Sequence, residues 1–157
     1  MRRGSSFFSP TRLRQCRTER GLTLEQLATG AVSEGARGLD PTAISHYEGG
    51  RRQPDVTLIG PLARALGVTN ADLLEPVGDL TLRYLRERAG LSQGQVADDL
   101  GIKTAAYSKL ELGQTLRVSP DRVSELTRVF GVDQATVLDA LRNSQDQPRQ
   151  RPAAAGS

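Results

Sequence analysis

Side chains able to carry covalent or metal chemistry are scarce in this sequence. Its 157 residues contain one cysteine, Cys16, and one histidine, His46. A single cysteine cannot form an internal disulfide. One cysteine and one histidine are also too few residues to make a metal-ligand set or a nucleophile with its base. The composition therefore favours a protein without enzymatic activity, and we expect no metal and no cofactor.

Cationic side chains are the other chemically useful group, and nearly all of them are arginine. The formal net charge is +3, and Lys103 and Lys109 are the only lysines. Arginine suits bidentate contact with phosphate, but where the charges lie matters more than their sum. No apolar run approaches the length of a membrane span, and residues 1–10 lack the apolar stretch of a signal peptide. We therefore expect a soluble cytoplasmic protein without a membrane partner.

An internal repeat determines how these residues are positioned. The segment LRQCRTERGLTLEQLA, from Leu13, matches LRYLRERAGLSQGQVA, from Leu82. After small register shifts, GLDPTAISHYEGG matches GIKTAAYSKLELG, and LARALGVTNADLL matches LTRVFGVDQATVL. Glycine, serine and glutamate positions recur together with the apolar ones, which argues against chance similarity between two amphipathic stretches. Two copies of one fold of about 60 residues account for most of the chain.

Helix signals predict five short helices in each copy and an all-α fold. Helix starts are indicated by Ser9 before Pro10, by the capping boxes at Thr23 and Ser92, and by Asp40 before Pro41. Gly67 and Gly131 occupy helix-stop positions. The predicted organisation is an N-terminal arm (1–8), a first domain (9–75), a linker (76–78), a second domain (79–142) and a disordered tail (143–157).

The combined landmarks resemble the Cro/phage-repressor (XRE) family of helix-turn-helix domains. The first copy carries Leu13-Arg14, Arg17, Gly21-Leu22-Thr23, Leu27-Ala28, Ser45, Tyr47-Glu48, Gly50 and Leu66-Gly67-Val68. The second carries Leu82-Arg83, Arg86, Gly90-Leu91-Ser92, Val96-Ala97, Ser108, Leu110-Glu111, Gly113 and Phe130-Gly131-Val132. The resemblance spans about residues 9–142 and implies two tandem helix-turn-helix domains that bind double-stranded DNA.

The resemblance also implies which residues face DNA. An α-helix fits the major groove, and residues on its first two turns reach base edges. The implied base-contacting residues are Thr42, Ala43, Ser45 and His46, and in the second copy Thr104, Ala105, Ser108 and Lys109. Ser45, Ser108 and His46 have equally plausible roles in ordinary packing or on the surface.

Phosphate contacts are expected at the start of each copy's second helix and in the loop after its third, where free N–H groups and cations suit an anion. The candidates are Thr23, Arg37, Arg51, Arg52, Ser92, Gln93 and Arg117. Gln93 stands where the family commonly has a phosphate-contacting glutamine, whereas the first copy has Leu24. Glu48 and Glu111 are interpreted as structural partners of Arg17 and Arg86, and Tyr107 as a core residue.

The two copies differ in charge and in the loop after the third helix. Residues 1–78 contain ten basic and eight acidic residues, whereas residues 79–142 contain nine of each. The second copy has the apolar residues Leu112, Leu116 and Val118 in that loop, which suits a protein contact better than a phosphate. The first copy has about six extra residues within 29–39, either a plain surface insertion or a flexible DNA-contacting element.

Two functions follow from this pattern. The first is a sequence-specific transcriptional regulator, with repression as the favoured mode, that acts in the cytoplasm on the bacterial nucleoid. The second is a protein-interaction module, antitoxin-like or an adaptor, whose degenerate second domain serves association. A homodimer and a heterologous protein partner both stay open. Salt-dependent DNA binding would discriminate the two functions.

Overall fold

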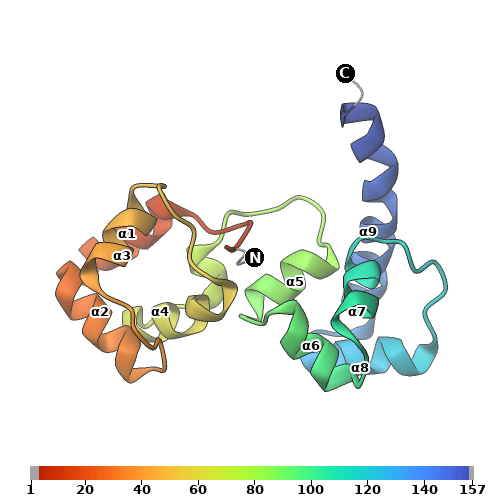
Figure 1. The fold of residues 1–157 in the computed structure, drawn as a ribbon, viewed down its shortest axis with the longest axis horizontal. Coiled ribbons are helices and arrows are strands. Elements are labelled where there is room, and N and C mark those ends of the chain that lie inside the picture. The colour runs from red at the N-terminus through yellow and green to blue at the C-terminus, as the bar shows by residue number, and fades with distance from the viewer. Residues whose placement is uncertain (1–3, 156–157) are drawn as a thin grey trace. The chain divides into compact units, whose positions relative to one another are not determined.

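The computed structural model describes residues 4–155, with side chains described for residues 4–146. The chain forms two compact units, Met1–Pro76 and Val77–Ser157, and each is described separately (Figure 1). Within the described residues the regular elements are nine α-helices and two short 3-10 helices, with only two isolated β-bridges. The prediction of an all-α fold is confirmed.

Unit 1, residues 1–76, contains four α-helices and two short 3-10 helices. Its elements are α1 (Pro10–Glu19), α2 (Leu24–Ser33), α3 (Pro41–Glu48), η1 (Val56–Leu58), α4 (Ile59–Leu66) and η2 (Asn70–Leu73). The side chains of Ser9, Thr23 and Asp40 cap the helices that follow them, as their types and positions predict. The core is aliphatic and includes Leu13, Leu27, Ile44, Ile59, Leu62 and Leu66.

The N-terminal segment Gly4–Phe8 belongs to unit 1, which differs from the predicted separate arm of residues 1–8. Gly4 forms an antiparallel bridge with Asp55, and Phe8 forms another with Leu74. The Phe8 ring is buried and meets the Tyr47 ring edge-on at 6.3 Å between centroids. Burial of this ring and the backbone pairing hold the segment in place. Residues 1–3 of the predicted arm lie outside the described residues.

Of the two alternatives for the extra residues of the first copy, a plain surface insertion or a flexible element, the structure shows an ordered turn. Helix α2 continues to Ser33, so part of the insertion is helical. Ala36 is fully buried. The Arg64 side chain donates hydrogen bonds to the Glu34 carboxylate and backbone carbonyl, both at 3.0 Å. These contacts fix the turn, and they leave Arg37 exposed.

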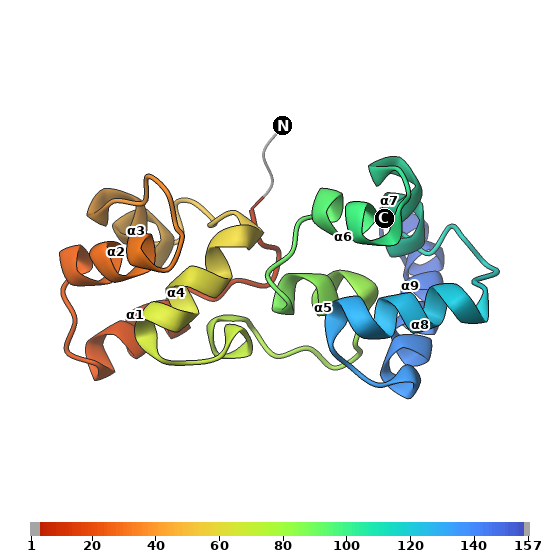
Figure 2. The ribbon, with the colours of Figure 1, turned by 90° about the horizontal axis from the view of Figure 1, so that it is seen from below.

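Unit 2, residues 77–157, contains five α-helices. They are α5 (Leu82–Arg88), α6 (Gln93–Leu100), α7 (Thr104–Glu111), α8 (Pro120–Phe130) and α9 (Gln134–Ala155). Figure 2 shows α8 crossing α9. The core of the unit includes Leu85, Val96, Tyr107, Leu126, Val137 and Leu141. Tyr107 is fully buried, which confirms its prediction as a core residue.

Helix α9 replaces the disordered tail predicted for residues 143–157. Its backbone is helical to Ala155, and Ser144 is 1% exposed. The Ser144 hydroxyl accepts a hydrogen bond from the Leu82 amide at 3.0 Å, and the Asn143 side chain donates to the Leu80 carbonyl at 2.8 Å. Polar side chains in this segment thus satisfy the backbone where α5 begins, which composition alone does not reveal. Residues 156–157 lie outside the described residues.

Candidate nucleic-acid interface

Each unit holds its third helix in place with the same three-group contact, which we call the Arg–Glu clamp. In unit 1, Arg17 Nε and Nη2 donate to the two Glu48 carboxylate oxygens at 2.6 and 3.0 Å. Arg17 Nη1 donates to the Leu22 carbonyl, just before α2, at 2.8 Å. The clamp therefore joins α1, the start of α2 and the end of α3.

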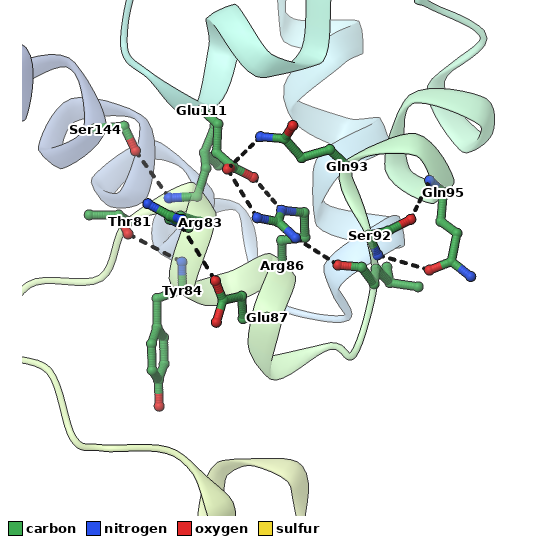
Figure 3. A network of polar contacts seen from close by, with 12 residues as sticks. Thr81, Arg83, Tyr84, Arg86, Glu87, Ser92, Gln93, Gln95, Glu111 and Ser144 are labelled. Carbon is green, nitrogen blue, oxygen red and sulfur yellow. Dashed lines mark hydrogen bonds and ion pairs between the residues drawn. The ribbon is translucent and has the colours of Figure 1, made fainter. Parts of the chain in front are cut away.

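Unit 2 repeats this clamp atom for atom (Figure 3). Arg86 pairs with Glu111 through Nε and Nη2, and its Nη1 donates to the Leu91 carbonyl at 2.9 Å. The prediction that Glu48 and Glu111 are structural partners of Arg17 and Arg86 is confirmed.

The clamps are buried ion pairs whose charges stay paired. The Arg86 and Glu111 side chains are 7% and 5% exposed, against 15% and 8% for Arg17 and Glu48. Burial acts to lower the pKa of Arg86, but the hydrogen bond and charge of Glu111 outweigh it, so the pKa is raised. Burial also raises the pKa of Tyr107, beside the same carboxylate, well above its usual value. Tyr107 is therefore neutral and both clamp arginines are charged.

Gln93 is attached to the clamp of unit 2. Its side-chain amide donates to Glu111 Oε1 at 3.0 Å, as Figure 3 shows. Leu24, at the same place in unit 1, has no amide to donate. The contact fixes the first turn of α6 against the end of α7. One amide N–H and the amide oxygen of Gln93 remain for another ligand.

The candidate base-contacting residues of unit 1 lie on the first two turns of α3. Thr42 is exposed, and Ala43, Ser45 and His46 are half-buried. The Nδ1 atom of His46 is buried and has no hydrogen-bond partner among the described residues. The structure brings these four residues together on one short helix, whose end the clamp anchors at Glu48.

The corresponding residues of unit 2 lie on α7 in the same way. Thr104, Ala105 and Lys109 are exposed, and Ser108 is half-buried. Lys109 occupies the position that His46 has on α3, because each follows the repeat's shared serine. The two helices thus carry different cationic or hydrogen-bonding groups at one equivalent position.

The phosphate candidates fall into three settings. Arg51 and Arg52 are exposed in the loop after α3, and the Arg52 guanidinium lies 5.8 Å from the centre of the Tyr47 ring. Thr23 and Ser92 use their hydroxyls to accept from the amides of Gln26 and Gln95, so the helix starts offer mainly backbone N–H groups. The remaining candidate, Arg117, lies in the α7–α8 loop beside apolar residues.

Three residues of unit 2 that shape this region were missed from the sequence. Asn143, Ser144 and Gln145 lie on α9, and the Gln145 amide donates to the Thr115 and Leu116 carbonyls at 3.2 and 3.3 Å. They thereby fix the start of α5 and the loop after α7. A signal was available, because Ser144 continues the helical spacing of Val137, Ala140 and Leu141.

Two kinds of feature are absent from the described residues. No group of three histidine, cysteine, aspartate or glutamate side chains there could hold a metal ion. No helix in the described part has both the length and the apolar character needed to cross a bilayer.

The repeated helix, tight connection and clamped second helix define a tandem helix-turn-helix protein, a class that binds DNA. The sequence profile of the helix-turn-helix domain family matches residues 11–76 and again residues 80–141. The chain belongs to this family, in two XRE-like copies, which confirms the resemblance seen in the sequence. Comparisons with curated proteins and with solved structures produced no match.

Proposed function

We propose that the protein is a sequence-specific transcriptional regulator, acting as a repressor, that inserts α3 and α7 into the major groove of double-stranded DNA. The observation that supports this most strongly is the Arg–Glu clamp, present in both units. It holds a short helix rigidly while leaving polar side chains on its first two turns unburied. Rigid presentation of such side chains is what base contact requires.

The two units would recognise unlike base sequences. In unit 1, Nε2 of His46 is the ring nitrogen available to a base edge, because Nδ1 is buried. In unit 2, the Lys109 ammonium at the equivalent position favours guanine O6 and N7. A single chain would then prefer an asymmetric site, and a homodimer would restore a palindrome.

Phosphate contact would come mainly from unit 1. Arg51 and Arg52 are exposed after α3, and Arg37 is exposed on the ordered turn. Thr23, Ser92 and Gln93 would contribute at the starts of α2 and α6, chiefly through backbone N–H groups. Regulation of transcription would place the protein in the cytoplasm, on the bacterial nucleoid.

The test combines genome-wide footprinting with titration of the recovered sites. We expect compact sites whose affinity falls steeply with salt. Arg51→Ala/Arg52→Ala should lower the log–log salt slope by about 2, since each phosphate contact contributes about 0.9. Arg142→Ala, an exposed arginine on α9, is the control and should leave the slope unchanged. The proposal would be contradicted if the parent bound the genome diffusely, without compact sites, and if the double variant and the control both bound in the same way.

A second candidate function is protein association through unit 2. It is favoured by Leu112 and Leu116, which are 36% and 71% exposed in the loop where unit 1 carries Arg51 and Arg52. Leu112→Ser/Leu116→Ser should then change oligomer size or DNA affinity. If both quantities stay at their parental values, this candidate fails.

A further inference from the structure

Unit 2 contains an open groove between α7 and the loop that leads to α8. It has a volume of about 330 Å³ and is lined by Ile102, Ala106, Leu110, Thr115, Arg117, Val118, Ser119 and Arg122. Four of these side chains are aliphatic, two are arginines and none is acidic. The loop itself is the turquoise segment between α7 and α8 in Figure 1.

The groove lies on a different side of α7 from two of the candidate base-contacting residues, Thr104 and Ser108. Successive helix residues are rotated by about 100°, so Ala106 and Leu110 project roughly opposite to Thr104 and Ser108, whereas Lys109 lies about 60° from Ala106. Occupation of the groove therefore leaves the side of α7 that carries Thr104 and Ser108 free.

Helix α9 holds the loop in shape. Gly113 has a φ of +77°, and a Cβ there would collide with the Ser144 carbonyl oxygen and lie 2.6 Å from the Gln145 Cα atom. The Gln145 amide also binds the carbonyls of Thr115 and Leu116. The wall of the groove is thus preformed, which lowers the entropic cost of binding a ligand.

The loop also offers unpaired backbone groups. Residues 114–119 have no regular secondary structure. Within the described part of the chain, the N–H and C=O groups of Arg117 and Val118 make no hydrogen bond. Such groups can pair with an added extended segment, as at the edge of a β-sheet.

Unit 1 shows an extended segment bound at the equivalent loop. Leu110 corresponds to Tyr47, because each directly precedes the shared glutamate. Ser119 corresponds to Asp55, because each caps the next helix, and Val118 and Pro54 directly precede these caps. In unit 1 all three contact the segment Gly4–Phe8: Phe8 packs on Tyr47, the Ser5 amide donates to the Pro54 carbonyl at 2.8 Å, and Gly4 bridges to Asp55.

The charges in the groove select the occupant. Arg117 has no partner among the described residues, and Arg122 uses Nη1 to donate to the Glu125 carboxylate and to the Leu100 carbonyl. A carboxylate beside an aliphatic side chain complements these groups. The N-terminal segment of a second copy is a poorer fit, because its Arg2 and Arg3 would face two like charges.

We propose that this groove of unit 2 binds an extended, acidic segment of a partner protein, with an aliphatic side chain over Leu110 and Val118 and a carboxylate at Arg117. The bound segment would add to the loop backbone as Gly4–Phe8 does in unit 1. This activity makes the second candidate function, protein association through unit 2, specific, and it does not depend on DNA binding.

The test is a selection on the full-length protein from a phage-displayed library of random dodecapeptides. Peptides that bind are resynthesised and titrated against the parent, Ala106→Gln and Arg117→Glu. We expect a consensus of Asp or Glu beside Leu, Ile or Val, with affinity reduced about tenfold by either substitution. Ala106 is exposed and glutamine is a good helix former, so Ala106→Gln narrows the groove without disturbing α7.

Matched controls separate this groove from its surroundings. Ser124→Gln and Arg128→Glu change exposed residues of α8 outside the groove and should leave peptide affinity unchanged. Arg51→Ala/Arg52→Ala, which removes phosphate candidates of unit 1, should keep the peptide affinity of the parent, so failure of peptide binding and failure of the proposed function are measured separately. The inference is overturned by peptides without a preference for carboxylates, by affinities insensitive to both groove substitutions, or by a dimer in sedimentation that Ala106→Gln dissociates.

Discussion

Arg86 and Arg17 each connect three helical segments. At the scale of single residues, they are the side chains on which the orientation of the third helix depends most. Each guanidinium uses its planar fork to bind both carboxylate oxygens and adds a backbone carbonyl from the turn before the next helix. Lysine could not satisfy three acceptors in this geometry. The orientation of α3 and α7 therefore depends on arginine side chains far from the residues that would meet a base.

Removal of Glu111 should strongly destabilise unit 2. Glu111→Ala leaves the Arg86 guanidinium buried without its partner, which costs about 3–5 kcal/mol in comparable buried pairs. Urea denaturation measures this loss. Asp139→Ala breaks an exposed pair with Arg142 and should cost less than about 1 kcal/mol. Equal costs for both variants would contradict a structural role for the clamp.

At the scale of elements, α9 distinguishes the second copy from the first. In unit 1 the chain after α4 forms only a single 3-10 turn, η2, and the N-terminal segment pairs with the residues after it. In unit 2 the last element is a long helix whose Ser144 and Gln145 contact α5 and the α7–α8 loop. The fold of unit 1 is thus completed by the segment before its first helix, and the fold of unit 2 by its last helix.

The glycine after each third helix should report this difference. Gly50 and Gly113 have φ values of +73° and +77°, but only Gly113 lies against another segment. Gly50→Ala should cost about 1–2 kcal/mol for the left-handed backbone. Gly113→Ala should cost about 1–3 kcal/mol more, because the methyl group meets α9. Thermal unfolding of the two variants measures the difference, and equal shifts would show that α9 does not pack there.

Ser144 tests α9 without changing the loop. Ser144→Ala leaves the buried Leu82 amide without an acceptor and should cost about 1–3 kcal/mol. Ser124→Ala, an exposed serine on α8, serves as the control. If the two variants have the same free energy of unfolding in urea, residues beyond Arg142 do not support unit 2.

How far the sequence predicts these elements depends on the range of the contacts that form them. The capping boxes at Thr23 and Ser92 and the left-handed Gly67 are local features, and the structure has them where the sequence predicts them. The Arg–Glu pairs were predicted from the repeated pattern. The packing of Asn143 and Ser144 depends on partners more than 60 residues earlier, and the groove depends on how α9 shapes a loop. Local composition predicts neither the packing of these two residues nor the groove.

For the whole molecule, the central fact is that each unit contains its own aliphatic core. Leu62 and Leu126 occupy equivalent core positions of α4 and α8, and both are fully buried. Cores of this size are marginal, so each unit is sensitive to one large-to-small substitution.

Core substitutions should therefore act on one unit at a time. Leu126→Ala should destabilise unit 2 by about 2–5 kcal/mol, and Leu62→Ala should do the same in unit 1. Hydrogen exchange followed by mass spectrometry should show faster exchange across the substituted unit and parental rates in the other. Faster exchange across both units from a single substitution would contradict separate cores.

The pairing of Gly4 with Asp55 also has a practical consequence for anyone who expresses this protein. Gly4, the first described residue, lies beside Gln53 and Asp55, shortly after the exposed arginines Arg51 and Arg52, so a tag fused ahead of the N-terminus is connected to unit 1 near these cations. An acidic tag there would compete with phosphate for these cations and mimic a loss of DNA affinity. Tags belong at the C-terminus, with an N-terminally tagged protein as the comparison that exposes the artefact.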